Sequence, residues 1–296
     1  MTMQKDCVSW RMPTALRSTP ELGAARNRRL YRSLTRTMRE YNRRLVEGLH
    51  ARNFTDFSPG PMNAEAILAQ LKPLGKDSYK RVLLKHGVPE PVFGVKIEEL
   101  KKFQKRIKVD YQLALDLYDT GVYDAMYLAG LIADDGQMTK KDLKKWVKNA
   151  SCPAIAEYTV PWVTSQGNFG RDLAFEWIDS KAELVATAGW ATLSCLVALV
   201  DDEELDIPEL KKLLARVGKT IQEQPNRVRY VMNGFMISVG ICVAELTDLA
   251  LATGAKVGAV SVNMGDTACK VPDISEYIGK VRARGTIGKK RKTVKC

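Results

Sequence analysis

The stretch Tyr127-Leu128-Ala129-Gly130-Leu131 decides the fold, together with Thr187-Ala188-Gly189-Trp190 and Met232-Asn233-Gly234-Phe235. Each stretch places a small residue and a glycine before a large apolar residue, inside a segment with helical periodicity. Because glycine costs a helix interior about 1 kcal/mol relative to alanine, the repeated glycines indicate that neighbouring helices approach closely at equivalent points. The pattern predicts an all-α solenoid of antiparallel helix pairs with a concave face that binds a large partner.

The rest of the chain fits helices separated by short turns. We expect helices over 64–71, 77–85, 97–105, 111–118, 122–133, 139–149, 154–165, 170–179, 181–200, 207–223, 226–240 and 241–254. The only strand signal is a weak alternation from Val257 to Val262. No run of 18 or more uncharged apolar residues occurs, so we expect no membrane-spanning helix.

The net charge of +12 is concentrated at the two ends of the chain. Residues 1–61 hold 12 Lys/Arg against 5 Asp/Glu, and residues 280–296 hold 8 Lys/Arg and no acid, which leaves −3 for residues 62–279. We therefore expect an Arg-rich, poorly ordered extension at 1–61, a helical-repeat domain at 62–279 and a basic tail at 280–296. The extension fits an arm that contacts phosphates, an organelle-targeting peptide, or translated sequence ahead of a start at Met62. These alternatives stay open.

Cysteine and histidine usage argues against a metal site. The six cysteines are scattered without a C-x-x-C pair, and there are two histidines. These numbers do not suit a histidine-rich metal site or a Ser-His-Asp triad. With no secretory signal at the start, we expect reduced thiols, no metal or cofactor, and a cytoplasmic protein located with chromosomal DNA.

Several stretches carry a resemblance to a known family. They are Phe93-Gly94-Val95-Lys96, Leu117-Tyr118-Asp119-Thr120-Gly121-Val122-Tyr123-Asp124-Ala125 and Leu128-Ala129-Gly130-Leu131-Ile132-Ala133-Asp134. From residue 64 to 254 the chain resembles the AlkD-like DNA alkylation repair family, a HEAT-like helical-repeat group. The tail strings Met264 to Pro272 and Gly288 to Lys292 look like the signature of a divergent subfamily.

The resemblance implies a HEAT-like superhelix that binds alkylated or distorted double-stranded DNA on its concave face, and we expect a monomer. Members that are enzymes resemble DNA glycosylases, which remove cationic N-alkylated purines. The implied catalytic carboxylate, which stabilises the developing sugar cation, falls on Glu157. The implied aromatic residue one turn earlier falls on Cys152 or Pro153, and the basic residue expected near Ala186 is missing.

Four aromatic residues are candidates for contact with the lesion or the DNA backbone. The resemblance implies this role for Phe235; Tyr158, Trp162 and Trp190 lie in comparable helical segments. The alternative interpretation for all four is packing between helices, since aromatic residues in amphipathic helices usually belong to the core.

Candidate phosphate-binding residues fall into three groups. They are Lys140, Lys144 and Lys148 in a five-lysine stripe, Arg227 and Arg229 at a helix start, and Lys289, Lys290, Arg291 and Lys292 in the tail. Each group is alternatively an ordinary solvated surface. Besides a glycosylase, two other functions therefore stay open: a DNA-structure-binding protein without catalysis, and a protein-interaction scaffold.

Overall fold

The computed structural model describes residues 62–296, which form one compact unit, Met62–Cys296. The predictions for residues 1–61 lie outside the described residues. The α-helices are α2 (Ala64–Leu71), α3 (Asp77–Lys85), α4 (Ile97–Ile107), α5 (Tyr111–Asp119), α6 (Tyr123–Ile132), α7 (Lys140–Lys148), α8 (Val160–Gln166), α9 (Gly170–Trp177), α10 (Glu183–Leu199), α11 (Ile207–Thr220), α12 (Asn226–Cys242), α13 (Thr247–Val257) and α14 (Ile274–Ala283). A π-helical turn, η2 (Ile155–Thr159), precedes α8, and short 3₁₀ turns are η1 (Lys72–Leu74), η3 (Asp202–Glu204), η4 (Ile221–Glu223) and η5 (Ala244–Leu246).

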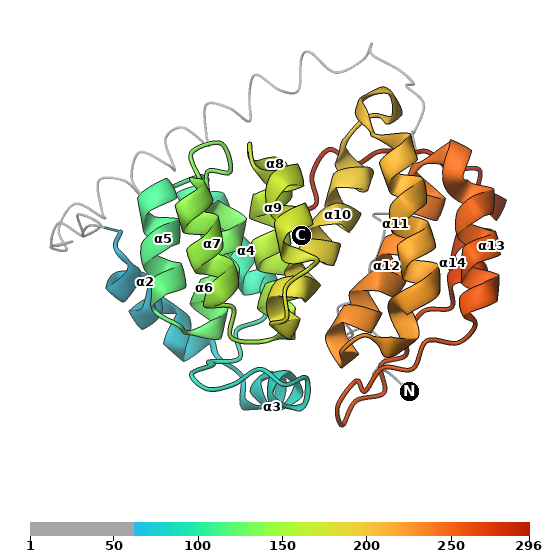
Figure 1. Cartoon of the computed structure of the whole chain (residues 1–296). Coiled ribbons are helices and arrows are strands. Elements are labelled where there is room, and N and C mark those ends of the chain that lie inside the picture. The colour runs from blue at the N-terminus through green and yellow to red at the C-terminus, as the bar shows by residue number, and fades with distance from the viewer. Residues whose placement is uncertain (1–61) are drawn as a thin grey trace, which may run out of the picture. The chain divides into compact units, whose positions relative to one another are not determined.

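The helices stack as antiparallel pairs in two rows (Figure 1). An inner row consists of α6, η2 with α8, α10 and α12, each packed on the next, and α14 extends this row beyond α12. An outer row consists of α5, α7, α9, α11 and α13. The prediction of an all-α, HEAT-like superhelix is confirmed. The described residues contain no strand, and the segment that follows Val257 is a loop.

Side-chain caps fix where several helices begin. Asn63, Asp110, Asp206 and Asp273 each accept a hydrogen bond from a backbone N–H in the first turn of the helix that follows. Thr139 caps α7, as part of a reciprocal capping box with Asp142. Such caps satisfy backbone donors that have no partner inside the helix.

Two of the three glycines that predicted close helix contacts lie at such contacts. A Cβ atom on Gly130 would lie 2.7 Å from Cγ2 of Thr159, and one on Gly189 would lie 2.7 Å from the backbone nitrogen of Ile178. The prediction is wrong for Gly234, where a Cβ would meet nothing within 4 Å. The equivalent contact on α12 is at Gly240, which packs against Ile278 of α14.

The outer row is joined by a ladder of surface ion pairs. Lys145 of α7 pairs with Asp119 of α5, and Lys140 and Lys144 pair with Asp172 and Glu176 of α9. Arg171 and Arg216 continue the ladder between α9 and α11. Exposed pairs of this kind each contribute at most about 1 kcal/mol, but together they neutralise the outer surface.

The prediction of a separate basic tail at 280–296 is wrong in two respects. Residues 274–283 form α14, whose buried Ile274, Ile278 and Val281 pack against α12 and α13. Residues 286–296, here called the strap, then run back across the C-terminal ends of the inner helices. The strap is therefore part of the folded unit.

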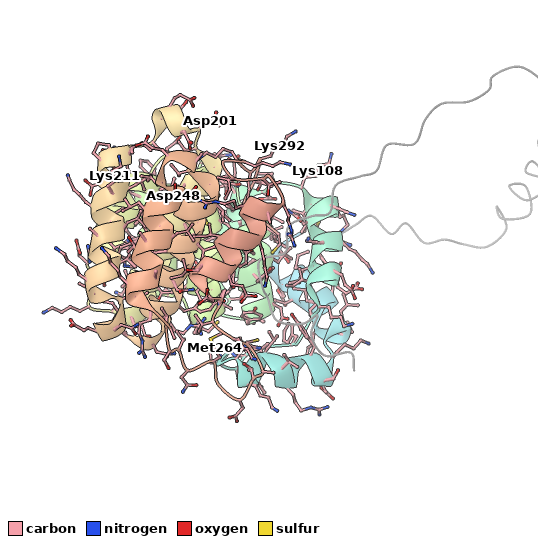
Figure 2. All side chains as sticks on the ribbon, turned by 90° about the vertical axis from the view of Figure 1, so that its right-hand side faces the viewer. Lys108, Asp201, Lys211, Asp248, Met264 and Lys292 are labelled. Carbon is pink, nitrogen blue, oxygen red and sulfur yellow. The ribbon has the colours of Figure 1, made fainter. Side chains whose placement is uncertain are left out.

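Backbone and lysine hydrogen bonds hold the strap. Its backbone amides at Gly288 and Arg291 donate to the carbonyl oxygens of Ile241 and Ala198, both at 2.8 Å. Lys290 Nζ donates to the carbonyl of Val197 at 2.9 Å, and Lys295 Nζ to that of Ala133 at 3.0 Å. The carbonyl ends of helices carry partial negative charge, so these cations stabilise the ends of α10 and α6. Figure 2 places Lys292 and Asp201 at this edge and Met264 at the opposite one.

Two sequence expectations concern cysteines and membrane spans. Cys152, Cys195, Cys242 and Cys296 are free thiols, as expected, whereas Cys269 is disulfide-bonded, which the scattered spacing did not indicate. Among residues 62–296, no single helix is long and apolar enough to cross a membrane. Only α12 taken together with 244–257 has the length and composition, and the two are bent by 117°.

Candidate functional site

Glu157 lies in the irregular turn η2, which leads directly into α8. Ile155–Thr159 is π-helical, with the Val160 N–H bonded to the carbonyl of Ile155. Pro161 explains the irregularity, because it has no N–H and its ring excludes the carbonyl of Glu157, four residues earlier. The proline thus opens the helical hydrogen-bond pattern at the carboxylate. Single π-turns inside α-helices are frequent at functional sites.

Arg227 binds Glu157 from the first turn of α12. Its Nε and Nη2 atoms lie 2.7 Å and 2.5 Å from the same oxygen, Glu157 Oε1. The Glu157 side chain is 5% exposed and the Arg227 side chain 16%, so the pair is largely out of water. Glu183, at the start of α10, accepts the backbone N–H of Arg227 at 2.6 Å. Three inner helices therefore begin at one cluster of charges.

Burial and the guanidinium act on Glu157 in opposite directions. Burial raises the pKa of Glu157 from its ordinary 4.5 to about 7, although the charge and hydrogen bonds of Arg227 pull it down. Burial is the larger effect, because moving a carboxylate out of water disfavours its ionised form. Burial thus disfavours the ionised form of Glu157, whereas Arg227 favours it.

Aromatic side chains surround the ion pair. The Arg227 guanidinium lies 4.6 Å from the ring centroid of Tyr230, a cation–π geometry. Half-buried Tyr158 lies 6.0 Å from Trp162, centroid to centroid, and Trp162 meets Tyr127 edge-on at 5.3 Å. Of the predicted aromatic residues, Tyr158 therefore lies beside Glu157, whereas Trp162 packs against Tyr158 and is itself buried.

The other two predicted aromatic residues lie in the core. Trp190 is 1% exposed and Phe235 is fully buried, and their rings contact each other edge-on at 5.3 Å. Neither ring can reach DNA in this fold, so their assignment as backbone-contacting residues is wrong. Trp190 and Phe235 instead pack between helices, which was the alternative interpretation of the sequence.

The predicted phosphate-binding residues divide according to their partners. Lys140, Lys144 and Arg227 are ion-paired within the unit. In the strap, Lys290 pairs with Asp202 at 2.7 Å and its side chain is 14% exposed, which makes it an anchor. Arg291 is half-buried, with its backbone N–H bonded to Ala198. Exposed cations remain at Lys148, Lys289 and Lys292, and a half-buried one at Arg229.

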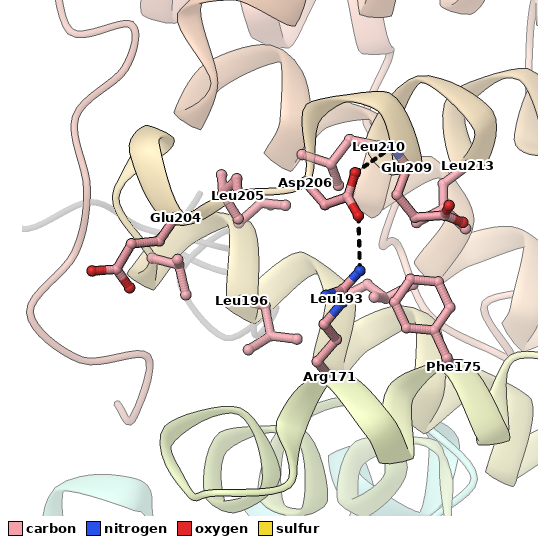
Figure 3. Close-up of a pocket in the computed structure, with 12 residues that line it drawn as sticks. Arg171, Phe175, Leu193, Leu196, Glu204, Leu205, Asp206, Glu209, Leu210 and Leu213 are labelled. Carbon is pink, nitrogen blue, oxygen red and sulfur yellow. Dashed lines mark hydrogen bonds and ion pairs between the residues drawn. The ribbon is translucent and has the colours of Figure 1, made fainter.

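Two hollows of the described unit lie away from Glu157. One hollow, with a volume of about 120 Å³, lies between α9, α10 and α11 (Figure 3). Its lining includes Leu193, Leu196 and Phe175, and the ion pair between Arg171 and Asp206, of 2.9 Å, also lies at this hollow. The other lies beside the strap and is lined by Asp135, Asp201 and Lys292. Neither hollow is lined by Glu157 or Arg227.

Sequence reasoning missed the partners that shape the site. It named Glu157 and Arg227 separately, but 70 positions separate the two residues, so no local pattern links them. It also missed Glu183, and the contact of Met264 Sδ with the Arg227 guanidinium at 3.5 Å. Ala186, near which the resemblance implied a basic residue, is itself buried, and the cation beside Glu157 is Arg227.

The fold and this site define the class of protein: a HEAT-like helical-repeat protein with a carboxylate on its inner row. A sequence model of the family described as "DNA alkylation repair enzyme" matches residues 67–266. Because that match covers more than half of the chain, the protein belongs to the DNA alkylation repair enzyme family.

Similar proteins extend over almost the same part of the chain. An uncharacterized protein of Listeria innocua, Lin0241, is 32% identical over 220 residues, which cover 73% of this chain and 95% of the relative. Lmo0209 of Listeria monocytogenes gives the same identity and coverage. A solved structure is 35% identical, with a TM-score of 0.74, over 79% of this chain and 100% of its own. It is described as a new family related to the HEAT-like repeat DNA glycosylases with affinity for branched DNA structures.

Proposed function

We propose that the protein binds distorted duplex DNA, branched DNA in particular, without removing bases. Membership of the DNA alkylation repair enzyme family supports DNA as the partner. The affinity of the structurally similar proteins for branched DNA supports a distorted duplex as the preferred form. The location of the protein would then be that of chromosomal DNA.

The ion pair between Glu157 and Arg227 carries the proposal. A glycosylase carboxylate must present negative charge to the sugar cation as the base leaves. A carboxylate 4 Å from a unit positive charge stabilises it by about 4 kcal/mol at an effective dielectric constant of 20, which is nearly a thousandfold in rate. Here two guanidinium nitrogens within 2.7 Å of the carboxylate oxygen oppose most of that field.

A glycosylase is a second candidate, and one observation favours it. Glu157 lies at the position that the family resemblance implies for the catalytic carboxylate, beside Tyr158. For catalysis, Arg227 would have to leave Glu157 and bind a DNA phosphate instead. That exchange would also have to replace the hydrogen bonds that Arg227 makes in the free protein.

A paired binding and excision assay tests the proposal. We expect a four-way junction to bind at least about tenfold more tightly than a linear duplex of the same arm sequence at 0.1 M salt, a difference of about 1.4 kcal/mol. We expect no release of 7-methylguanine or 3-methyladenine from methylated duplex. Absence of binding to either DNA contradicts the proposal. Base release that disappears in Glu157→Gln establishes the second candidate in its place.

A further inference from the structure

We propose that residues 72–108, which hold η1, α3 and α4, form the surface that grips the phosphate backbone of the bound DNA. This inference rests on the proposed function and names the surface through which it acts. Residues 72–108 are here called the cationic end.

Charge is strongly polarised inside the body of the protein. The cationic end holds 11 Lys/Arg against 4 Asp/Glu, a net charge of +7. Residues 109–296 hold 23 Lys/Arg against 24 Asp/Glu, a net charge of −1. The net positive charge of the described unit therefore comes from this end, and a polyanion such as duplex DNA is attracted to it.

Most cations of this end are free to bind. Six of them are exposed and make no ion pair within the described unit: Lys72, Lys76, Arg81, Lys85, Lys105 and Lys108. The lysine stripe of α7 differs, since three of its five lysines are paired with acids of α5 and α9. Unpaired, solvated cations can neutralise phosphates and so release the counterions condensed on the DNA, which supplies a large share of DNA affinity.

One cation of this end occupies a backbone conformation that is unfavourable for lysine. Lys108 ends α4 with a φ of 67°, a conformation that favours glycine. The stability of the fold does not explain a lysine there, whereas phosphate binding does.

The cationic end is fixed to the core and borders the candidate site. Buried Asp124 of α6 accepts the backbone N–H groups of Phe93 and Val95, at 2.6 and 2.7 Å, and so holds the connection between α3 and α4. At the end of α3, the carbonyl of Lys85 lies against Gly265, next to Met264, which contacts Arg227. A duplex on α3 would therefore run toward the Glu157–Arg227 pair.

Neutralising double variants test this surface. Arg81→Gln/Lys85→Gln changes α3, and Lys105→Gln/Lys108→Gln changes the end of α4. Lys141→Gln/Lys219→Gln is the matched control on the outer helices α7 and α11, where both lysines are exposed and make no ion pair within the described unit. Affinity for a four-way junction would be measured by gel shift from 0.05 to 0.3 M salt. Thermal unfolding would verify that each variant folds.

Each phosphate contact changes the slope of log K against log salt by about 0.9, or about 8-fold in affinity at 0.1 M salt. We expect each cationic-end variant to lose about 60-fold in affinity and about 1.8 in slope, and the control variant to lose less than about threefold.

Equal losses in all three variants, or no loss in the α3 and α4 variants, would overturn the inference and leave the proposed function standing. Loss of binding to phosphatidylserine vesicles with unchanged junction binding would also overturn it. Wild-type protein that binds no DNA contradicts the proposed function itself.

Discussion

The substitution Arg227→Met examines the buried ion pair directly. Methionine keeps an unbranched apolar chain over Tyr230 and removes the guanidinium, so Glu157 loses its counter-ion while 5% exposed. Removing one partner of a buried ion pair costs about 3–5 kcal/mol when the other stays charged. When Glu157 instead takes up a proton, the loss falls to the hydrogen bonds alone, about 1–3 kcal/mol.

The cost of Arg227→Met therefore depends on pH, and its direction follows from the pKa. In the wild type the folded pKa of Glu157, about 7, lies above its ordinary 4.5. Its contribution to stability is thus fully present below about pH 4.5 and is lost as pH rises to about 7, a change of about 3 kcal/mol. Without Arg227 the folded pKa rises further, so the loss continues above pH 7.

Urea unfolding followed by tryptophan fluorescence at pH 5.5, 7.0 and 8.5 measures this dependence. We expect the variant to lose more stability at pH 8.5 than at pH 5.5, and Glu157→Gln added to Arg227→Met to restore most of it at pH 8.5. Lys144→Met, which breaks the exposed pair with Glu176, should cost less than about 1 kcal/mol at every pH. A loss that is the same at all three pH values, with no rescue, refutes the reasoning.

Four further variants test the packing of the unit. Gly189→Ala should lower the free energy of unfolding by about 1–3 kcal/mol, because the new Cβ would strike the backbone at Trp177 and Ile178. Gly234→Ala should raise the free energy of unfolding by up to about 1 kcal/mol, because its Cβ would meet open space. Thermal unfolding that ranks the two variants the other way contradicts the helix contacts. Lys290→Met/Lys295→Met should cost about 3 kcal/mol in urea and make residues 286–296 sensitive to protease, since these lysines anchor the strap; unchanged protease resistance would mean that the strap is held otherwise. Asp124→Asn should cost about 2 kcal/mol because a charged acceptor of two backbone N–H groups is lost; a Tm equal to the wild type contradicts this role.

The helices were predictable because their signals are local. Caps such as Thr139 and apolar periodicity placed most of their ends within a few residues of those observed. Helix α14 was not predicted, because residues 280–296 were assigned to a tail from their charge alone. The spacing of Ile274, Ile278 and Val281 does predict a helix. The strap left no such signal, since most of its hydrogen bonds come from backbone amides and single lysines.

The site was only partly predictable because its contacts are not local. Glu157 and Arg227 were both candidates, but the sequence could not reveal that one neutralises the other across 70 positions. Trp190 and Phe235 follow glycines in the same pattern whether they face a partner or the core, so burial had to decide. Averaging charge over residues 62–279 gave −3 and concealed the cationic end.

The central claim is that Arg227 neutralises the Glu157 carboxylate and that the protein binds DNA without removing bases. Measuring base excision and binding on the same methylated DNA tests this claim most directly. Wild-type protein would be titrated against N-methylated duplex and junction at 0.1 M salt, and free bases would be quantified from the bound fractions. We predict saturable binding with base release no faster than the spontaneous rate. Release well above that rate, abolished by Glu157→Gln, would show that Arg227 vacates the carboxylate and would contradict this account.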